Sequence, residues 1–148
     1  MRLVMTLLFA LALPLSAAVG DELTTKPSKY AVKETVDRLT TALKEKGITP
    51  AARVDHAAAA KAAGLDLKPT EVLLFGNPKL GTPLMQSNRN VAIDLPMRVL
   101  VWEDDAGKVW IGYTSPSTLK TRYKIDGRDE ILKTLAGALD AFTNAAAN

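Results

Sequence analysis

The sequence predicts an α+β domain, a mixed α/β two-layer sandwich in which helices pack on a β-sheet. Residues 71–76 form a short apolar run between turn signals, which is typical of a buried strand. Residues 97–113 hold two β-rich runs around a three-residue loop, the pattern of a β-hairpin. Residues 127–144 carry apolar side chains at helical spacing, so an amphipathic helix is predicted after the hairpin. With the elements below, the predicted order is β-α-β-α-β-α-β-β-α.

The elements before the buried strand are predicted from shorter signals. Residues 22–30 fit a first strand, and residues 33–46 have the apolar spacing of a helix. A short strand is predicted over residues 48–54. Asp55 then caps an alanine-rich helix that ends at Gly64. The N-terminal half is therefore expected to alternate strands and helices.

The loop after the buried strand is expected to lead into a third helix over residues 83–90. Thr82 is a good N-cap residue, and Pro83 at the first helical position loses no hydrogen bond. Asp126 is predicted to cap the last helix in the same way. Much of the Gly- and Pro-rich composition of residues 76–82 is explained by turn formation alone.

The hairpin predicts its own register, because a three-residue loop with Gly at its end, residues 105–107, fixes the pairing. In that register Trp102 faces Trp110, and Leu100 faces Gly112. Both faces of the hairpin are largely apolar, whereas a sheet with one face in water alternates more cleanly. We therefore expect helices on one face and a second copy of the chain on the other, which makes a homodimer. The alternative is two helical layers from the same chain.

The N-terminus has the composition of a cleavable signal peptide, residues 1–18. Arg2 precedes a 13-residue apolar stretch, Leu3 to Leu15, and small residues follow it. A membrane span needs about 20 residues, so an uncleaved anchor is the less favoured alternative. Cleavage after Ala18, or else after Gly20, leaves a single domain without a transmembrane segment. The predicted location is periplasmic or secreted, and the absence of cysteine excludes a lipoprotein anchor and disulfides.

The charge distribution argues against nucleic-acid binding. The formal net charge of the whole chain is +3, and loss of Arg2 with the signal peptide leaves +2. The lysines are scattered among aspartates and glutamates, whereas nucleic-acid binding needs a basic stripe or patch. We expect no nucleic-acid partner.

Two stretches connect the chain to a known family. The strings FGNPKLGTPLM (residues 75–85) and IDLPMRVLVWEDDAGKVW (residues 93–110) resemble the domain of unknown function 302 family, and the resemblance covers about residues 30–125. It implies a small α/β sandwich, exported or cytosolic, with no established reaction. Members of this family commonly carry an Arg-His pair after the second hairpin strand. The corresponding residues here are Arg122 and Tyr123, so a role for that histidine is not carried over.

Signals for catalysis are weak. His56 is the only histidine, and it lies beside Asp55 at a predicted helix start. Metal sites need three or four ligands from His, Cys and carboxylates, so no metal site is predicted. His56, Asp55 and Tyr123 remain the catalytic candidates, and the catalytic residues of an enzyme would otherwise be unknown. No Ser-His-Asp order, paired-carboxylate motif or dinucleotide loop is present, and no cofactor is expected.

Signals for ligand binding are concentrated in the loop after the buried strand. Asn77, Lys79 and the amides from Thr82 onward would form an anion site, because free N–H groups at a helix start attract anions. Trp102 and Trp110 would line an apolar pocket, although aromatic residues on a sheet are more often core or interface. The alternative is a structural role, in which Asn77 caps a turn and Lys79 is solvated.

Two further groups of polar residues have a structural and a functional interpretation. Asp94, before Leu95-Pro96, is expected to fix the turn into the hairpin. Arg89, Arg98 and Arg122 would bind an acidic ligand if the fold brought them together.

These signals favour an exported homodimer that binds a small anionic or amphipathic ligand near residues 76–84. The first alternative is an enzyme of unassigned class that uses His56 or a buried aspartate. The second is a scaffold that binds only other envelope proteins.

Overall fold

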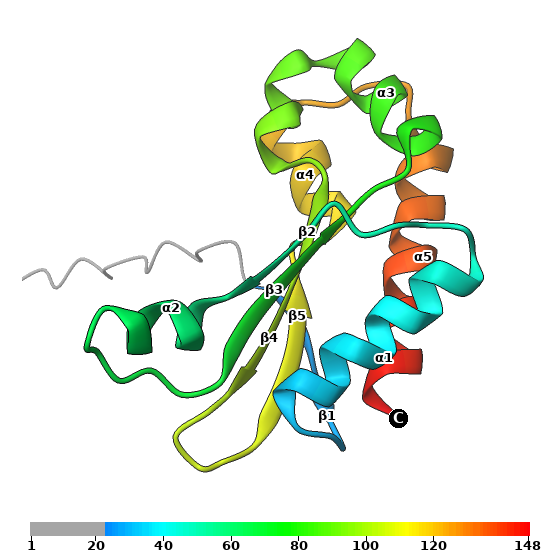
Figure 1. Ribbon diagram of the computed structural model, residues 1–148. Coiled ribbons are helices and arrows are strands. Elements are labelled where there is room, and N and C mark those ends of the chain that lie inside the picture. Colours follow the sequence, from blue (N-terminus) through cyan, green and yellow to red (C-terminus); the bar gives the residue numbers. More distant parts are fainter. Residues whose placement is uncertain (1–22) are drawn as a thin grey trace, which may run out of the picture.

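The computed structural model describes residues 23–148, so the predicted signal peptide lies outside the described residues. It has a five-stranded sheet with helices packed on one face (Figure 1). The α+β fold class predicted from the sequence is confirmed. The strands are β1 (Thr24–Ser28), β2 (Ala52–Asp55), β3 (Thr70–Phe75), β4 (Met97–Glu103) and β5 (Val109–Tyr113). The helices are α1 (Val32–Glu45), α2 (His56–Ala62), α3 (Pro78–Ser87), the 3-10 helix η1 (Arg89–Asp94), α4 (Pro116–Tyr123) and α5 (Asp129–Ala147).

The sheet is antiparallel throughout, with the strand order β1-β5-β4-β3-β2. In the β4–β5 hairpin Trp102 pairs with Trp110, and Leu100 pairs with Gly112. The predicted register is therefore confirmed. Gly107 in the loop has a φ of 79°, the left-handed conformation that this loop type requires. Because only glycine adopts it without strain, the loop length and the register are fixed together.

One face of the sheet, the inner face, holds the core. Every second residue of β3, β4 and β5 points toward α1 and α5 and is buried, because strand side chains alternate between the two faces. α1 contributes its apolar stripe, and α5 packs beside it. The central buried residues are Leu73, Phe75, Val99, Val101 and Ile111 from the sheet, Val36, Leu39 and Leu43 from α1, and Leu135 and Leu139 from α5.

The opposite face, the outer face, is apolar but is not covered by a helix within residues 23–148. Its large apolar side chains are partly buried, except that Val54 is 39% exposed, and Arg98 is exposed. α2 has no buried residue, and α4 packs against α5 and η1. Two helical layers on the sheet are therefore not found among the described residues. The outer face comprises Thr25, Pro27, Ala52, Val54, Thr70, Val72, Leu74, Arg98, Leu100, Trp102, Trp110 and Gly112.

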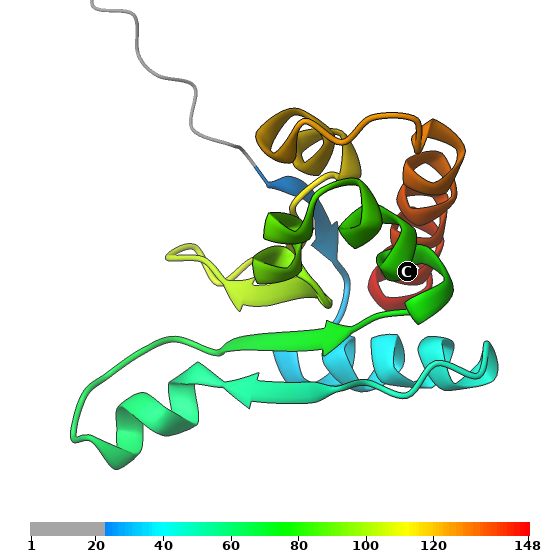
Figure 2. The ribbon, with the colours of Figure 1, turned by 90° about the horizontal axis from the view of Figure 1, so that it is seen from above.

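Seen from above, β2 and α2 form the margin of the molecule (Figure 2). β2 is an edge strand that pairs with β3 alone. The prediction that Asp55 caps the helix after it is correct, since its carboxylate accepts the amide of Ala58 at 2.8 Å. With no buried side chain of its own, α2 is held by this cap and by its connections to β2 and β3.

The end of α5 is fastened to the start of the domain. The amide of Lys29 donates to the carbonyl of Ala147 at 3.0 Å. The guanidinium of Arg38 on α1 donates to the carbonyls of Ala145 and Ala146, at 3.1 and 3.2 Å. These hydrogen bonds, together with the pairing of β1 with β5, therefore join the N-terminal elements to the C-terminal half of the domain.

The predicted start of the third helix is wrong. α3 begins at Pro78, and Asn77 is its N-cap, with its side-chain oxygen accepting the amide of Lys79 at 2.9 Å. Thr82 and Pro83 therefore lie inside the helix. Both Asn77-Pro78 and Thr82-Pro83 are valid start signals, and the first one is used. Pro83 then leaves the Lys79 carbonyl without the amide that would normally bond to it.

One other local prediction is wrong, and two elements were not predicted. Asp126 does not cap the last helix: its side chain accepts the amide of Gly127, and α5 begins at Asp129 with no side-chain cap. The two unpredicted elements are η1 and α4. α4 begins at a Ser115-Pro116 pair, with the Ser115 hydroxyl accepting the amide of Thr118 at 3.2 Å.

For the described part of the chain, no helix combines the length and the apolar character needed to cross a membrane.

Candidate ligand-binding site

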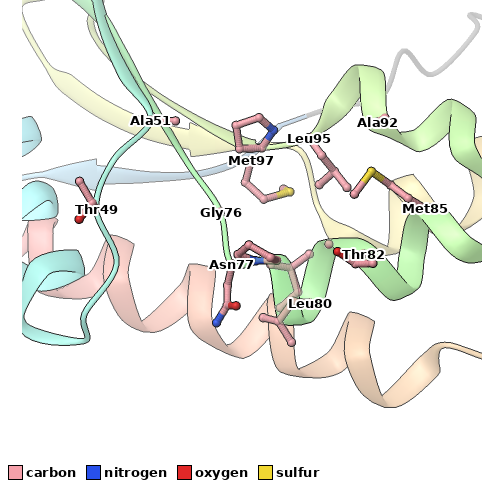
Figure 3. A pocket seen from close by; sticks show the side chains of 14 residues that line it. Thr49, Ala51, Gly76, Asn77, Leu80, Thr82, Met85, Ala92, Leu95 and Met97 are labelled. Atoms are coloured by element: carbon pink, nitrogen blue, oxygen red, sulfur yellow. The ribbon is translucent and has the colours of Figure 1, made fainter.

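A cavity of about 370 Å³ lies where β3 ends and α3 begins. Its walls come from α3, η1, the start of β4 and one side chain of α5 (Figure 3). Its apolar lining is Ala51, Leu80, Met85, Ala92, Leu95, Pro96, Met97 and Leu135, and its polar side chains are Thr49, Asn77 and Thr82.

Local sequence explains why a cavity forms at this point. β3 stops at Gly76, where an added Cβ would lie 3.1 Å from the Cβ of Pro96, so the chain passes closely over the start of β4. α3 then leaves the sheet, anchored by Leu84, its one fully buried side chain. Leu80 and Met85 of the same helix are only partly buried against the core, and the space beside them is the cavity.

The chemistry of the lining favours an apolar or amphipathic molecule. No charged side chain lines the cavity, and Met85 and Met97 are flexible groups that adapt to the shape of a ligand. Asn77 uses its side-chain oxygen as a helix cap, while its Nδ2 donates to no group within residues 23–148. Small-molecule sites commonly combine such an apolar wall with a few polar groups.

The structure brings only two of the predicted ligand-binding residues together. Asn77 and Thr82 line the cavity, whereas Lys79 is exposed and does not. Trp102 and Trp110 lie on the outer face of the sheet, where the indole N–H of Trp110 donates to Asp104 at 2.8 Å.

The start of α3 has no free amides for an anion. The amide of Lys79 donates to the Asn77 side chain, and those of Leu80 and Gly81 donate to the Asn77 carbonyl, each at 2.9 Å. Pro78 has no N–H, and Thr82 lies inside the helix. Any affinity for an anion at this end would therefore have to come from the exposed Lys79.

The catalytic candidates lie at different ends of the molecule. Asp55 and His56 are exposed at the junction of β2 and α2, and the Asp55 carboxylate is used as a helix cap. Tyr123 is the last residue of α4, and α4 lies at the end of the sheet opposite to α2 (Figure 1). Among residues 23–148, no three His, Asp or Glu side chains are grouped so as to hold a metal ion.

A polar cluster surrounds Asp94, which the sequence predicts only as a turn residue. Its carboxylate, 13% exposed, accepts Arg122 Nη1 at 2.6 Å, the Tyr123 hydroxyl at 2.5 Å, and Arg98 Nη2. Two of the three arginines thus converge, but on a carboxylate of the chain itself. Burial acts to raise the pKa of Asp94, but the hydrogen bonds from Tyr123 and Arg122 and the charges of both arginines outweigh it. The pKa of Asp94 is therefore lowered.

Asp94→Asn is expected to make the free energy of unfolding depend less on pH in the acidic range. A lowered folded pKa means that the carboxylate contributes its full stability above the ordinary value of about 3.9 and loses it as the pH falls through the folded value. Urea unfolding at pH 7 should show a loss of about 2 kcal/mol in the variant. The difference from wild type should shrink at pH 2–3. Asp66→Asn, in the exposed segment after α2, is the control. Equal differences at both pH values would contradict this role for Asp94.

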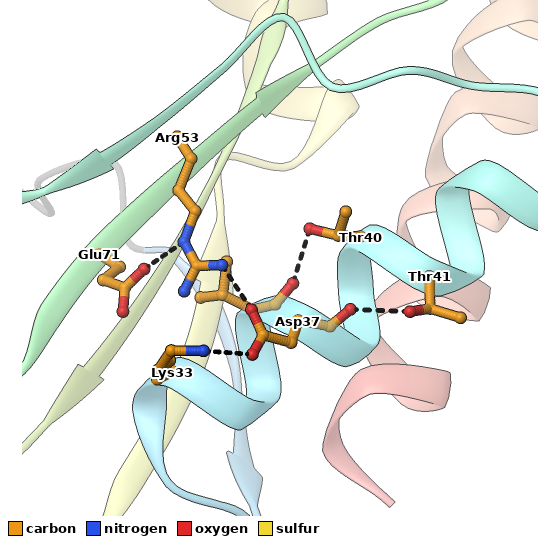
Figure 4. Close-up of polar contacts among 7 residues, drawn as sticks. Lys33, Asp37, Thr40, Thr41, Arg53 and Glu71 are labelled. Carbon is orange, nitrogen blue, oxygen red and sulfur yellow. Dashed lines mark hydrogen bonds and ion pairs between the residues drawn. The ribbon is translucent and has the colours of Figure 1, made fainter.

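A second cluster joins the edge strand β2 to α1 (Figure 4). Arg53 donates from Nε to Glu71 at 2.6 Å and from Nη1 to Asp37 at 2.5 Å. The Glu71 side chain lies on the inner face and is 7% exposed. Lys33 bonds to Asp37 at 2.7 Å, and its hydrogen bond, then that of Arg53, lowers the pKa of Asp37. The cluster supplies the partner that a buried carboxylate requires.

Comparisons with known proteins agree with this fold. A solved structure described as an uncharacterized conserved protein DUF302 from Bacillus stearothermophilus matches with a TM-score of 0.74 and 23% identity. The match covers 84% of this chain and 97% of that one. At this identity the likeness shows the fold alone.

Curated relatives match over a shorter share of their length. The chain is 44% identical over 112 residues to the protein named fluoride-specific ion channel FluC 1 in Brucella suis biovar 1, and equally to its namesake in Brucella abortus biovar 1. These matches cover 76% of this chain but only 44% and 42% of those proteins. The chain therefore spans less than half the length of the curated relatives that it matches.

The family itself is shown by a match that spans most of the chain. The sequence model of the family described as "Domain of unknown function DUF302" matches residues 24–142, from β1 into α5. The chain therefore belongs to the DUF302 family.

Proposed function

We propose that this domain is an exported module that binds a small amphipathic molecule in the cavity beneath α3 and acts as a homodimer. The observation that carries the ligand-binding part is the cavity of about 370 Å³ with an apolar wall and a polar edge. Its size lies within the range of about 300–1,000 Å³ that is common for ligand sites. Export is supported by the composition of residues 1–18 alone.

The lining suggests how such a ligand would lie. Its apolar body would contact Met85, Met97 and Leu135, and a hydroxyl or carbonyl group would accept a hydrogen bond from Asn77 Nδ2. An acidic group would extend out of the cavity toward Lys79, because no charged side chain lines the interior. The proposed ligand is thus a small molecule with one apolar end and one polar end.

Native mass spectrometry of the protein, purified gently from its own envelope fraction, tests the proposal as a whole. We expect the mass of a chain cleaved near Ala18, twice that mass for the dimer, and a reproducible added component of low mass. A bare protein would contradict a tightly held ligand. A second protein in stoichiometric amount, in place of a small molecule, would favour the scaffold role instead.

Blocking the cavity should abolish binding of an apolar probe. Ala92 is exposed at the cavity wall, so Ala92→Trp places an indole in the space without disturbing the core. We expect the affinity for octanol or octanoate to fall by about tenfold or more, equivalent to about 1.4 kcal/mol, in calorimetric titrations. Ala141→Trp, on the exposed side of α5, is the matched control and should bind normally.

The same titrations can assign the role of Lys79. Lys79→Glu should weaken octanoate and leave octanol unchanged, while Lys133→Glu on the exposed surface of α5 should affect neither. If Ala92→Trp binds as well as wild type, the cavity is not the binding site. If only the Lys79 effect is absent, the ligand is amphipathic without being anionic.

A further inference from the structure

We infer that the outer face of the sheet is the dimer interface, and that the strands of the two sheets run antiparallel across it. This inference rests on the homodimer of the proposed function and specifies its surface and geometry. The order of side chains along β4 leads to both conclusions.

The outer face has the character of a surface that another layer covers. Leu74, Leu100, Trp102 and Trp110 lie side by side on three adjacent strands. They are only partly buried, and no helix within residues 23–148 packs over them. A continuous apolar patch of this kind on an otherwise charged protein is typical of an interaction surface.

A second copy fits this face because its central row is self-complementary. Along β4 the residues that point outward are Arg98, Leu100 and Trp102, and Asp104 continues the row at the start of the hairpin loop. The row therefore reads cation, apolar, apolar, anion. A two-fold axis between Leu100 and Trp102, lying in the interface and perpendicular to the strands, places each Arg98 opposite the partner's Asp104.

The other symmetric arrangement is less favourable. An axis parallel to the strands would place Arg98 of one copy over the same end of the other copy, so that like charges meet. Both charged groups have capacity for a further bond. Arg98 has a half-exposed side chain and uses Nη2 for Asp94. Asp104 accepts two backbone amides with Oδ1 and the indole N–H of Trp110 with Oδ2, so Oδ2 can accept one more donor. Lys108, whose Nζ lies 4.2 Å from the centre of the Trp110 ring, would lie at the rim of the dimer interface.

The geometry also predicts how strong the dimer is. Two sheets that pack face to face lie about 10 Å apart with their strands within about 30° of one another. A face of five short strands is about 20 Å across, so it buries roughly 800 Å² over both copies, less than the range of about 1,200–2,000 Å² for stable specific interfaces. We therefore expect a dimer that dissociates on dilution.

Sedimentation equilibrium over a range of concentrations tests the surface. Leu100→Glu should weaken the dimer by about 20-fold or more, because a charge would be buried at the centre of the contact. Ile93→Glu is the control, since Ile93 is an exposed apolar residue (77%) away from this face. Leu74→Glu provides a second variant if the first does not fold, as judged by circular dichroism.

The outcomes separate the inference from the proposal on which it rests. A wild-type protein that is a monomer at all concentrations would overturn both. A Leu100→Glu variant that still forms dimers would overturn the interface and leave the homodimer standing. Monomeric, folded Leu100→Glu that still binds octanol would support the interface and show that the cavity functions without it.

Cross-linking tests the antiparallel geometry, because the chain has no native cysteine. R98C and D104C would each be treated with a short bis-maleimide that spans about the 10 Å between packed sheets, first alone and then as a mixture. The inference predicts a cross-linked dimer only in the mixture. Cross-linking of R98C with itself, without a gain in the mixture, would overturn the antiparallel arrangement.

Discussion

Leu84→Ala is expected to lower the free energy of unfolding by about 3 kcal/mol and to release α3 from the sheet. Leu84 is fully buried, and it is the one side chain of α3 that is. Removal of its three methyl and methine carbons leaves a void that α3 can close only by moving. Since α3 forms a wall of the ligand cavity, octanol binding should be lost in the same variant.

Hydrogen exchange separates a local effect from a global one. In Leu84→Ala the amides of α3 should exchange faster than those of α1, because α3 opens as a unit of low stability. Leu39→Ala is the matched control, since Leu39 is equally buried but lies in α1 against the centre of the sheet. It should speed exchange throughout the domain. Uniform exchange in both variants would mean that α3 has no independent opening.

Arg53→Met is expected to cost about 2 kcal/mol of stability, because it leaves the carboxylate of Glu71 without its partner. The Glu71 side chain is 7% exposed, so water cannot replace the guanidinium. The cost is smaller than for a fully buried pair, since the Arg53 side chain is 34% exposed and solvent screens part of the interaction. Urea unfolding at neutral pH measures the loss.

A double-mutant cycle identifies the cause. Arg53→Met combined with Glu71→Met removes the whole pair and should recover most of the stability, because an apolar pair of similar volume has no desolvation cost. Lys33→Met is the surface control: the Lys33 side chain is 78% exposed, and its ion pair with Asp37 should contribute less than about 0.5 kcal/mol. If the double variant is as unstable as Arg53→Met, packing rather than charge explains the effect.

The hairpin shows what could be predicted from sequence. Its register depends on a loop of residues 105–107, in which a glycine occupies the left-handed position. A local signal therefore determines all the cross-strand pairs of β4 and β5. α1 and α5 were predicted for a similar reason, since a long apolar stripe with helical spacing has no competing interpretation. Local and tertiary preferences agree in these elements.

Errors occurred where two local signals competed or where a signal was present but unused. Asn77-Pro78 and Thr82-Pro83 are equivalent helix starts, and the end of β3 at Phe75 allows the first to be used. α4 begins at Ser115-Pro116, a signal of the same kind that could have been found. Its short length and weak apolar spacing made it hard to distinguish from a loop.

The candidate site was less predictable than the fold. Its location at the end of β3 was predicted, and Asn77 and Thr82 do line the cavity. Its other walls come from Thr49, Leu95 and Leu135, which are far apart in the sequence and carry no motif. The Asp94 cluster joins residues 28 and 29 positions apart. Only the packing of α4 on η1 brings them together, and no sequence spacing encodes that contact.

The junction between the last turn of α5 and the start of α1 has a consequence for synthesis. Lys29 and Arg38 bond to carbonyls of residues 145–147, and β1 pairs with β5. The N-terminus of a growing chain leaves the ribosome first. β1 and α1 therefore emerge before β5 and residues 145–147, to which they bond. The bonds that join α1 to the end of α5 therefore cannot form until residue 147 has left the exit tunnel. For a protein with the export that we propose, this delay would keep the chain open enough to pass through a narrow translocation channel.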